Sequence, residues 1–274
     1  MQTREDTADL TTWQAAGLHL DAAGYILPSN RTDEQHQPMA DDMIANSLVW
    51  LVMQVVNLVA AGNRLSADRR GPSGRVGKEE PSLEYWENLI EQIDVWYNGL
   101  PARFQPTSTV WPEEDKTGAN LPSQWYAGAL HASTIQWYHF ARIEMLHNKP
   151  QHSQNQRQSS LMTKLSPVTS PLLPEEQQPS YADVLQQSKY HAKEILSIGC
   201  ALTDEGARVH SVQPLYAAGQ VLGMQVDLDE SSAQEHSALR ACVIGLLGDI
   251  ERDTGWATQY RATQLLNQWG RPEG

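Results

Sequence analysis

The sequence predicts an all-α fold, a single multi-helix domain with one long polar insertion. Apolar residues recur at spacings of three and four in several segments, and no strand-type alternation of useful length is present. Hydrophobic residues make up 40% of the 274 residues, which is enough for a sizeable core. We assign an N-terminal helix and a polar turn region to residues 1–39 and the all-α domain to residues 40–274.

The first predicted helix covers residues 8–23, with Trp13, Leu18 and Leu20 as its apolar contacts. A polar turn region follows in residues 28–38, where proline, asparagine and charged residues gather.

The second predicted helix covers residues 40–61. Asp41 and Asp42 lie in its first turn, where negative charge favours the helix dipole, and Gly62 is expected to end it. Its most apolar run, residues 48–61, is too short to span a bilayer and is interrupted by two amide side chains. We therefore expect a buried helix of a soluble protein, without membrane contact.

The remaining apolar patterns predict further helices over residues 82–100, 122–147, 181–202, 209–224, 233–253 and 256–269. The segment 122–147 is apolar on several faces, so we expect it to be the central helix, beginning at Pro122. Residues 148–180 are rich in Gln, Ser and Pro and cannot bury enough apolar surface to fold. They predict a disordered insertion.

Charge and cysteine usage exclude two classes of function. The chain carries 20 basic and 33 acidic residues, a net charge of −13, so we expect no direct binding of nucleic acid by this chain. Cys200 and Cys242 each lie in an apolar helical pattern without a CxxC pair or a nearby histidine at zinc spacing. We expect two small buried core residues in a reducing compartment, and neither a disulfide scaffold nor a metal site.

Sequence motifs for catalysis are absent: no phosphate-binding loop, no GxSxG nucleophile elbow and no HExxH pair occurs. We predict no catalytic residue, no cofactor and no metal ligand. One alternative is an all-α enzyme that acts on a hydrophobic metabolite with Mg²⁺, for which Asp249, Glu251 and Asp253, or Asp41 with Asp42, would hold the ion. A solvated helix end explains the first cluster better.

The remaining group of interest is Trp137, Tyr138, His139 and Arg142 in the central helix. Aromatic rings beside a histidine and an arginine suit a pocket for a small, partly polar effector. In the alternative, the aromatic rings fill the core and Arg142 pairs with Glu144 or with a carboxylate from another helix.

Four blocks in order resemble the regulatory domain of fungal zinc-cluster transcription factors, the fungal-specific transcription factor domain. They are WENLIEQIDVWYNGLPARFQP at 86–106, the run YHFARIEML within 127–146, HAKEILSIGCAL and HSVQPLYAAGQVL within 191–222, and LLGDIERDTGWATQYRATQLLNQW at 246–269.

The resemblance implies a non-catalytic regulatory or interaction domain of a transcription regulator, acting in the nucleus, or in the cytoplasm as a truncated form. In that interpretation, control of the domain comes from a small-molecule effector, from a protein partner in transcription regulation, or from an intramolecular contact with another domain. The family's six-cysteine zinc cluster is missing, because two distant cysteines cannot replace it. A third interpretation is an interaction protein that binds no ligand.

Overall fold

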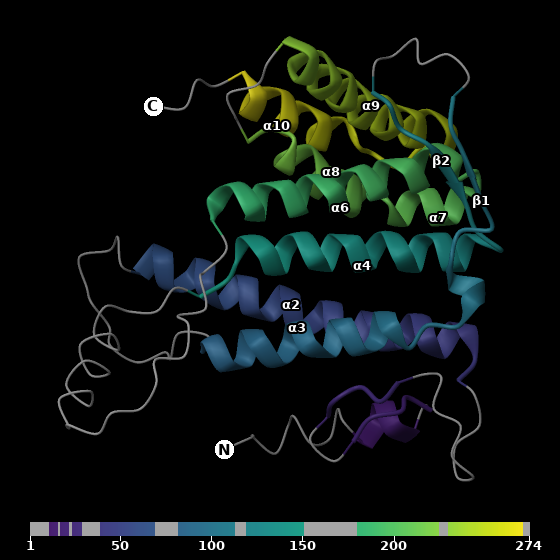
Figure 1. Cartoon of the computed structure of the whole chain (residues 1–274), viewed down its shortest axis with the longest axis vertical. Helices are drawn as coiled ribbons and strands as arrows, with labels where there is room; N and C mark the ends of the chain where they lie inside the picture. Colours follow the sequence, from purple (N-terminus) through teal and green to yellow (C-terminus); the bar gives the residue numbers. More distant parts are fainter. Residues whose placement is uncertain are drawn as a thin grey trace, which may run out of the picture.

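A computed structural model describes residues 11–15, 17–21, 24–28, 39–68, 82–112, 119–150, 180–224 and 230–270. The described part confirms the all-α prediction, and its helices are stacked in layers that follow the order of the sequence (Figure 1). Residues 151–179, which make up most of the predicted disordered insertion at 148–180, lie outside the described residues.

The N-terminal region departs from the predicted helix at 8–23. Residues 11–15 are helical, but Gly17 has a φ of +100° and ends the helix, since a left-handed backbone cannot continue it. Leu20 and Ile26 then form an isolated antiparallel bridge, and both are buried. The apolar contacts were predicted correctly, but the predicted helix is wrong for residues 17–21, and its residues 8–10, 16, 22 and 23 lie outside the described residues.

Helix α2 (Asp41–Asp68) begins with the two predicted aspartates but runs through Gly62. The predicted stop was wrong because Gly62 keeps helical geometry, and a glycine inside a helix costs only about 1 kcal/mol. By length and composition alone, the segment Asp41–Gly62, which is longer than the apolar run 48–61, could cross a membrane. Buried core helices satisfy the same criteria, and Ile44, Leu51 and Val55 have no exposed surface.

Helix α3 (Leu83–Asn98) forms as predicted. The Ser82 hydroxyl accepts a hydrogen bond from the Tyr85 amide and caps the first turn. The predicted apolar stripe faces inward, and its buried side chains include Trp86, Leu89, Ile93 and Trp96.

A small hairpin precedes the central helix and was not predicted. Strand β1 (Ser108–Val110) pairs antiparallel with β2 (Ser123–Trp125), after a short 3₁₀ turn, η1 (Ala102–Phe104). Three-residue strands are too short to show alternation in the sequence. The predicted helix start at Pro122 was therefore wrong, and α4 (Ala129–His147) begins after Gly128.

Helix α4 is the central helix, as predicted. Its buried residues cover several faces and include Ala132, Ile135, Tyr138, Phe140 and Met145. It packs against α2 and α3 on one side and against α6 (Tyr181–Ala201), α7 (Glu205–His210) and α8 (Val212–Val221) on the other (Figure 1).

The predicted helix at 209–224 is divided between α7 and α8 at Ser211. The buried Ser211 hydroxyl donates a hydrogen bond of 2.6 Å to Oε1 of Gln136 in α4, whose Nε2 donates to the Ile195 carbonyl at 3.0 Å. These hydrogen bonds to α4 and α6 fix the break between α7 and α8, where the local sequence pattern had suggested one continuous helix.

The last two helices are α9 (Glu230–Thr254) and α10 (Gln259–Trp269), close to their predicted bounds. Gly255 has a φ of +71° and ends α9, as expected.

The prediction of two buried cysteines was wrong for Cys200, which is exposed, while Cys242 is half-buried. Both cysteines lie at the edge of the interface between α6 and α9. Apolar neighbours in the sequence therefore did not ensure that these two side chains are buried in the core.

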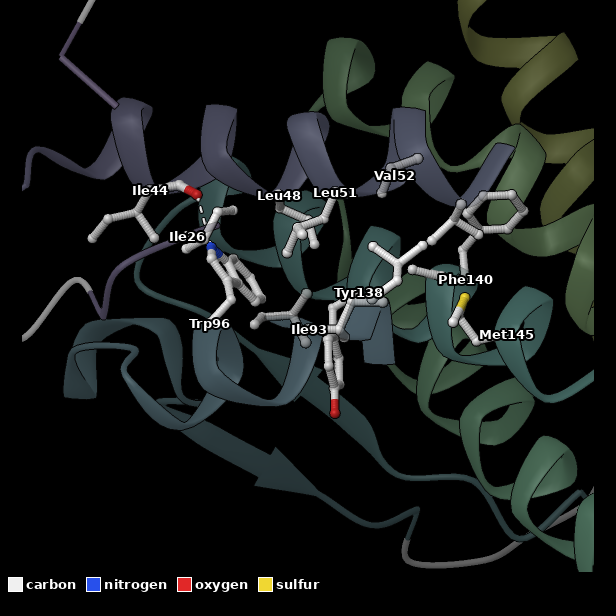
Figure 2. Close-up of a cluster of buried hydrophobic side chains, with 14 of the residues drawn as sticks. Ile26, Ile44, Leu48, Leu51, Val52, Ile93, Trp96, Tyr138, Phe140 and Met145 are labelled. Atoms are coloured by element: carbon white, nitrogen blue, oxygen red, sulfur yellow. Dashed lines mark hydrogen bonds between the residues drawn. The ribbon is translucent and has the colours of Figure 1, made fainter. Parts of the chain in front are cut away.

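Two apolar clusters fill the fold. One joins α2, α3 and α4 with Leu18, Leu20 and Ile26 from the N-terminal region, and the other joins α6, α8, α9 and α10. Figure 2 shows the first cluster, in which the Trp96 indole nitrogen points to the Ile44 carbonyl of α2. Helices α4 and α6 lie between the two clusters.

Candidate functional site

The four residues of the predicted effector pocket lie on two sides of α4. Trp137 lines an open cleft between α4 and α2. Tyr138 and His139 are buried, and Arg142 lies with them toward α3 and α6, away from the cleft lining. The structure therefore separates the tryptophan from the other three residues.

Arg142 takes part in a polar cluster between α3 and α4. Its guanidinium pairs with the Asp94 carboxylate of α3, as the alternative of a carboxylate from another helix anticipated. Beside this pair, the Tyr97 and Tyr138 rings stack with their centroids 4.2 Å apart and their planes 11° apart. These contacts join α3 to α4 and engage Arg142 and Tyr138 in packing between the two helices.

His139 of α4 and His191 of α6 meet in the interior. Their Nδ1 atoms are 2.8 Å apart, so one ring donates its Nδ1 hydrogen to the other, and both rings must be neutral or share a single charge. Burial, followed by the charge of Arg142, lowers the pKa of His191 to about 3. Burial, followed by His191 and Arg142, lowers the pKa of His139 well below its usual value.

This histidine pair predicts that the free energy of unfolding falls on acidification. Both pKa values are depressed in the folded chain, so the unfolded chain takes up protons first as pH drops below about 6.5. His191 alone should lower the free energy of unfolding by about 2 kcal/mol between pH 7 and pH 5. Urea unfolding at these two pH values measures the loss.

The variant His191→Gln should show a smaller pH dependence over the same range, because one titrating ring is gone. Its unfolding at pH 8 gives the packing cost separately, since histidines are neutral there in both states. An unchanged pH dependence would contradict neutral burial of this pair.

An open, largely apolar cleft lies between α2 and α4. It has a volume of about 540 Å³ and is lined by Ala45, Asn46, Leu48, Val49, Val52, Met53, Val56, Asn57, Leu130, Ser133, Thr134, Trp137 and His210. Val49, Met53 and Val56 are each about half exposed (48%, 50% and 49%), although they belong to the most apolar stretch of the sequence.

The arrangement of the cleft follows from the period of α2. Leu48, Leu51 and Val55 turn into the core, while Val49, Met53 and Val56 recur at spacings of four and three on the outer face. Trp137 forms the opposite wall and meets Phe140 edge to face, with ring centroids 5.1 Å apart. The lining contains no Lys, Arg, Asp or Glu, so the cleft suits a neutral apolar group.

The carboxylates considered for Mg²⁺ have other roles. Asp249 pairs with Arg252, and Asp253 pairs with Arg208 and Arg252. Glu251 accepts hydrogen bonds from the Thr258 and Gln259 amides, at 2.9 and 2.7 Å, at the start of α10.

Asp41, at the start of α2, pairs with Arg103 and His131. Asp42 accepts a hydrogen bond of 2.9 Å from the Met43 amide. Among the described residues, no three His, Cys, Asp or Glu side chains group as metal ligands.

The sequence of the chain is similar to a known regulator. It is 34% identical over 283 residues to the transcription activator AMTR1 of Alternaria alternata, and the match covers 99% of this chain and 33% of the activator. The chain thus resembles part of a fungal transcription activator. It spans about a third of the length of that relative. No family model matches the chain, and no solved structure matches it.

Proposed function

We propose that this chain is a non-catalytic regulatory domain of a fungal transcription regulator, of the fungal-specific transcription factor type, and that a small apolar effector binds in the α2–α4 cleft. The similarity to a transcription activator supports the regulatory role. The cleft supports the effector, because Val49, Met53 and Val56 present a continuous apolar wall opposite Trp137. In this proposal the domain works in the nucleus with protein partners, and DNA is contacted by another module.

The size and chemistry of the cleft define the effector class. A volume of about 540 Å³ falls within the range of small-molecule sites, and the polar side chains of the lining are those of Asn46, Asn57, Ser133, Thr134 and His210. A neutral molecule with an apolar body and one or two polar groups fits this lining. A strongly anionic ligand does not fit it, since the lining carries no basic side chain other than His210 and the chain has a net charge of −13.

The effector site predicts saturable binding of a neutral apolar probe, N-phenyl-1-naphthylamine, to the purified chain. We expect one probe per chain, with its fluorescence enhanced on binding. Met53→Lys should weaken binding about tenfold or more, because it places a charge in the apolar wall without disturbing the core. Fluorescence titration measures both dissociation constants.

Leu266→Lys is the matched control. Leu266 is 52% exposed on α10, so the same charge enters an exposed helical leucine away from the cleft, and the affinity should not change. Arg142→Ala should lower the melting temperature through loss of the Asp94 pair while leaving probe affinity unchanged. Equal binding by Met53→Lys and the parent chain would contradict the cleft assignment, and loss of binding in Arg142→Ala would move the site to the polar cluster.

A reporter assay tests the regulatory role separately. The chain is fused to an unrelated DNA-binding domain in a fungal host, and transcription from the cognate promoter is compared with that from the DNA-binding domain alone. A changed reporter level supports the proposal, and an unchanged level with a well-expressed fusion contradicts it.

A further inference from the structure

The two cysteines of the chain face each other across a helix interface. Cys200 lies near the end of α6 and Cys242 lies in α9, and 42 positions separate them in the sequence. Their sulfur atoms are 3.8 Å apart, and both thiols are free. The sequence contains no other cysteine.

The contact suits disulfide formation. A disulfide requires a sulfur–sulfur distance of about 2.05 Å, so the two side chains must rotate, or the packed helices α6 and α9 shift slightly, to bring the sulfurs from contact into bonding distance. Cys200 is exposed, so a small oxidant reaches it from solvent, whereas Cys242 is half-buried behind it.

The two thiols differ in pKa, and therefore in their reactivity toward an oxidant. The contact with the Cys242 thiol lowers the pKa of Cys200, whereas the contact with Cys200, together with burial, raises the pKa of Cys242. A thiolate is the form that attacks peroxides and disulfides. Because Cys200 is the exposed sulfur and Cys242 is half-buried, Cys200 is the attacking sulfur and Cys242 the resolving one, in agreement with the lowered pKa of Cys200.

We propose that Cys200 and Cys242 form a peroxide-reactive dithiol that closes to a disulfide between α6 and α9. The Cys200 thiolate attacks one oxygen of a hydroperoxide, the O–O bond breaks, and the leaving oxygen takes up a proton to depart as water or an alcohol. The Cys200 sulfenic acid then reacts with the Cys242 thiol: the S–S bond forms, the S–O bond breaks, and water leaves. The two thiols lose two electrons in total, and the peroxide gains them.

The disulfide would make the domain responsive to oxidation, in addition to its response to the proposed effector. It would enclose the segment that contains α7 and α8, and α8 contributes to the same apolar cluster as α6 and α9. Closing a loop of this length stabilises a folded chain, so we expect the melting temperature to rise by about 5 °C or more on oxidation.

Intact mass measurement tests the dithiol. The reduced chain is exposed to a small excess of hydrogen peroxide, quenched with catalase, denatured and treated with N-ethylmaleimide. We expect a mass loss of about 2 Da with no maleimide adduct, and two adducts after treatment with dithiothreitol. Two adducts without reductant, or disulfide-linked dimers in place of the intramolecular bond, would overturn the proposal.

Two variants separate the roles of the sulfurs. In Cys242→Ser, oxidation should stop at a Cys200 sulfenic acid that dimedone traps, and in Cys200→Ser the Cys242 thiol should stay reduced over the same exposure. Oxidation of the parent chain in urea is the control for proximity. The disulfide should then form at least about tenfold more slowly, because unfolding separates the two sulfurs. Equal rates in the folded and unfolded chain would show that the fold does not position this pair.

Discussion

Trp96→Ala is expected to lower the free energy of unfolding by about 3–5 kcal/mol, because it removes a large buried side chain and leaves a cavity. Trp96 is 1% exposed and lies between α2 and α4 in the first apolar cluster (Figure 2). Its indole nitrogen donates to the Ser47 hydroxyl at 2.8 Å and to the Ile44 carbonyl at 3.2 Å. Urea unfolding followed by circular dichroism measures the change.

Two further variants separate the contributions of side-chain volume, hydrogen bonding and burial to this loss of stability. Trp96→Phe keeps most of the apolar volume but removes the donor to Ser47, so it should cost about 1–3 kcal/mol. Trp256→Ala, at a tryptophan that is 55% exposed, should stay within about 0.5 kcal/mol of the parent. Similar losses for the buried and the exposed tryptophan would contradict the position of Trp96 in the core.

Gly219→Val is expected to destabilise the chain by about 3 kcal/mol through overpacking between α8 and α10. A Cβ atom at Gly219 would lie 2.5 Å from Cδ1 and 2.9 Å from Cδ2 of Leu265, which is fully buried. The Gly219 carbonyl also accepts a hydrogen bond of 3.0 Å from the Trp269 indole, so α10 cannot retreat without losing it. Thermal and urea unfolding measure the loss.

Gly245→Ala is the matched control, because a Cβ atom there meets nothing within 4 Å. It lies inside α9 and should raise stability by about 0.5–1 kcal/mol through helix propensity. Adding Leu265→Ala to Gly219→Val should recover part of the loss relative to the sum of the single changes. Strict additivity of the two changes would contradict direct contact between these positions.

Helices were predicted correctly from the sequence where the local apolar pattern agrees with the burial seen in the structure. The apolar pattern over 82–100 predicted α3, which Ser82 caps, and the segment that is apolar on several faces became the central helix α4. The prediction failed at Gly62, because a glycine that follows an apolar helical run can take a positive φ, as Gly255 does, or remain helical, as Gly62 does within α2. Prediction from the sequence also failed where a distant partner decides. The strand Ser123–Trp125 depends on pairing with residues 108–110, which the local pattern does not show.

The candidate site was predicted only in part for the same reason. Trp137 lines the cleft, but its opposite wall comes from Val49, Met53 and Val56, in a run so apolar that full burial was the natural expectation. Periodicity identifies the faces of α2, and tertiary packing decides which face is covered. The contact between Cys200 and Cys242 joins two helices and has no local signature either.

The layered stack of helices has a consequence for how the chain is made. α2 packs with α3, α4 with α2, α6 with α4, α8 with α6, α9 with α8, and α10 with α9 (Figure 1). Each new layer therefore meets a surface that has already been synthesised, and the first apolar cluster is nearly complete once α4 has left the ribosome. Contacts between neighbouring segments favour rapid folding, so this architecture allows the protein to fold progressively during translation, from its N-terminal half to its C-terminal half.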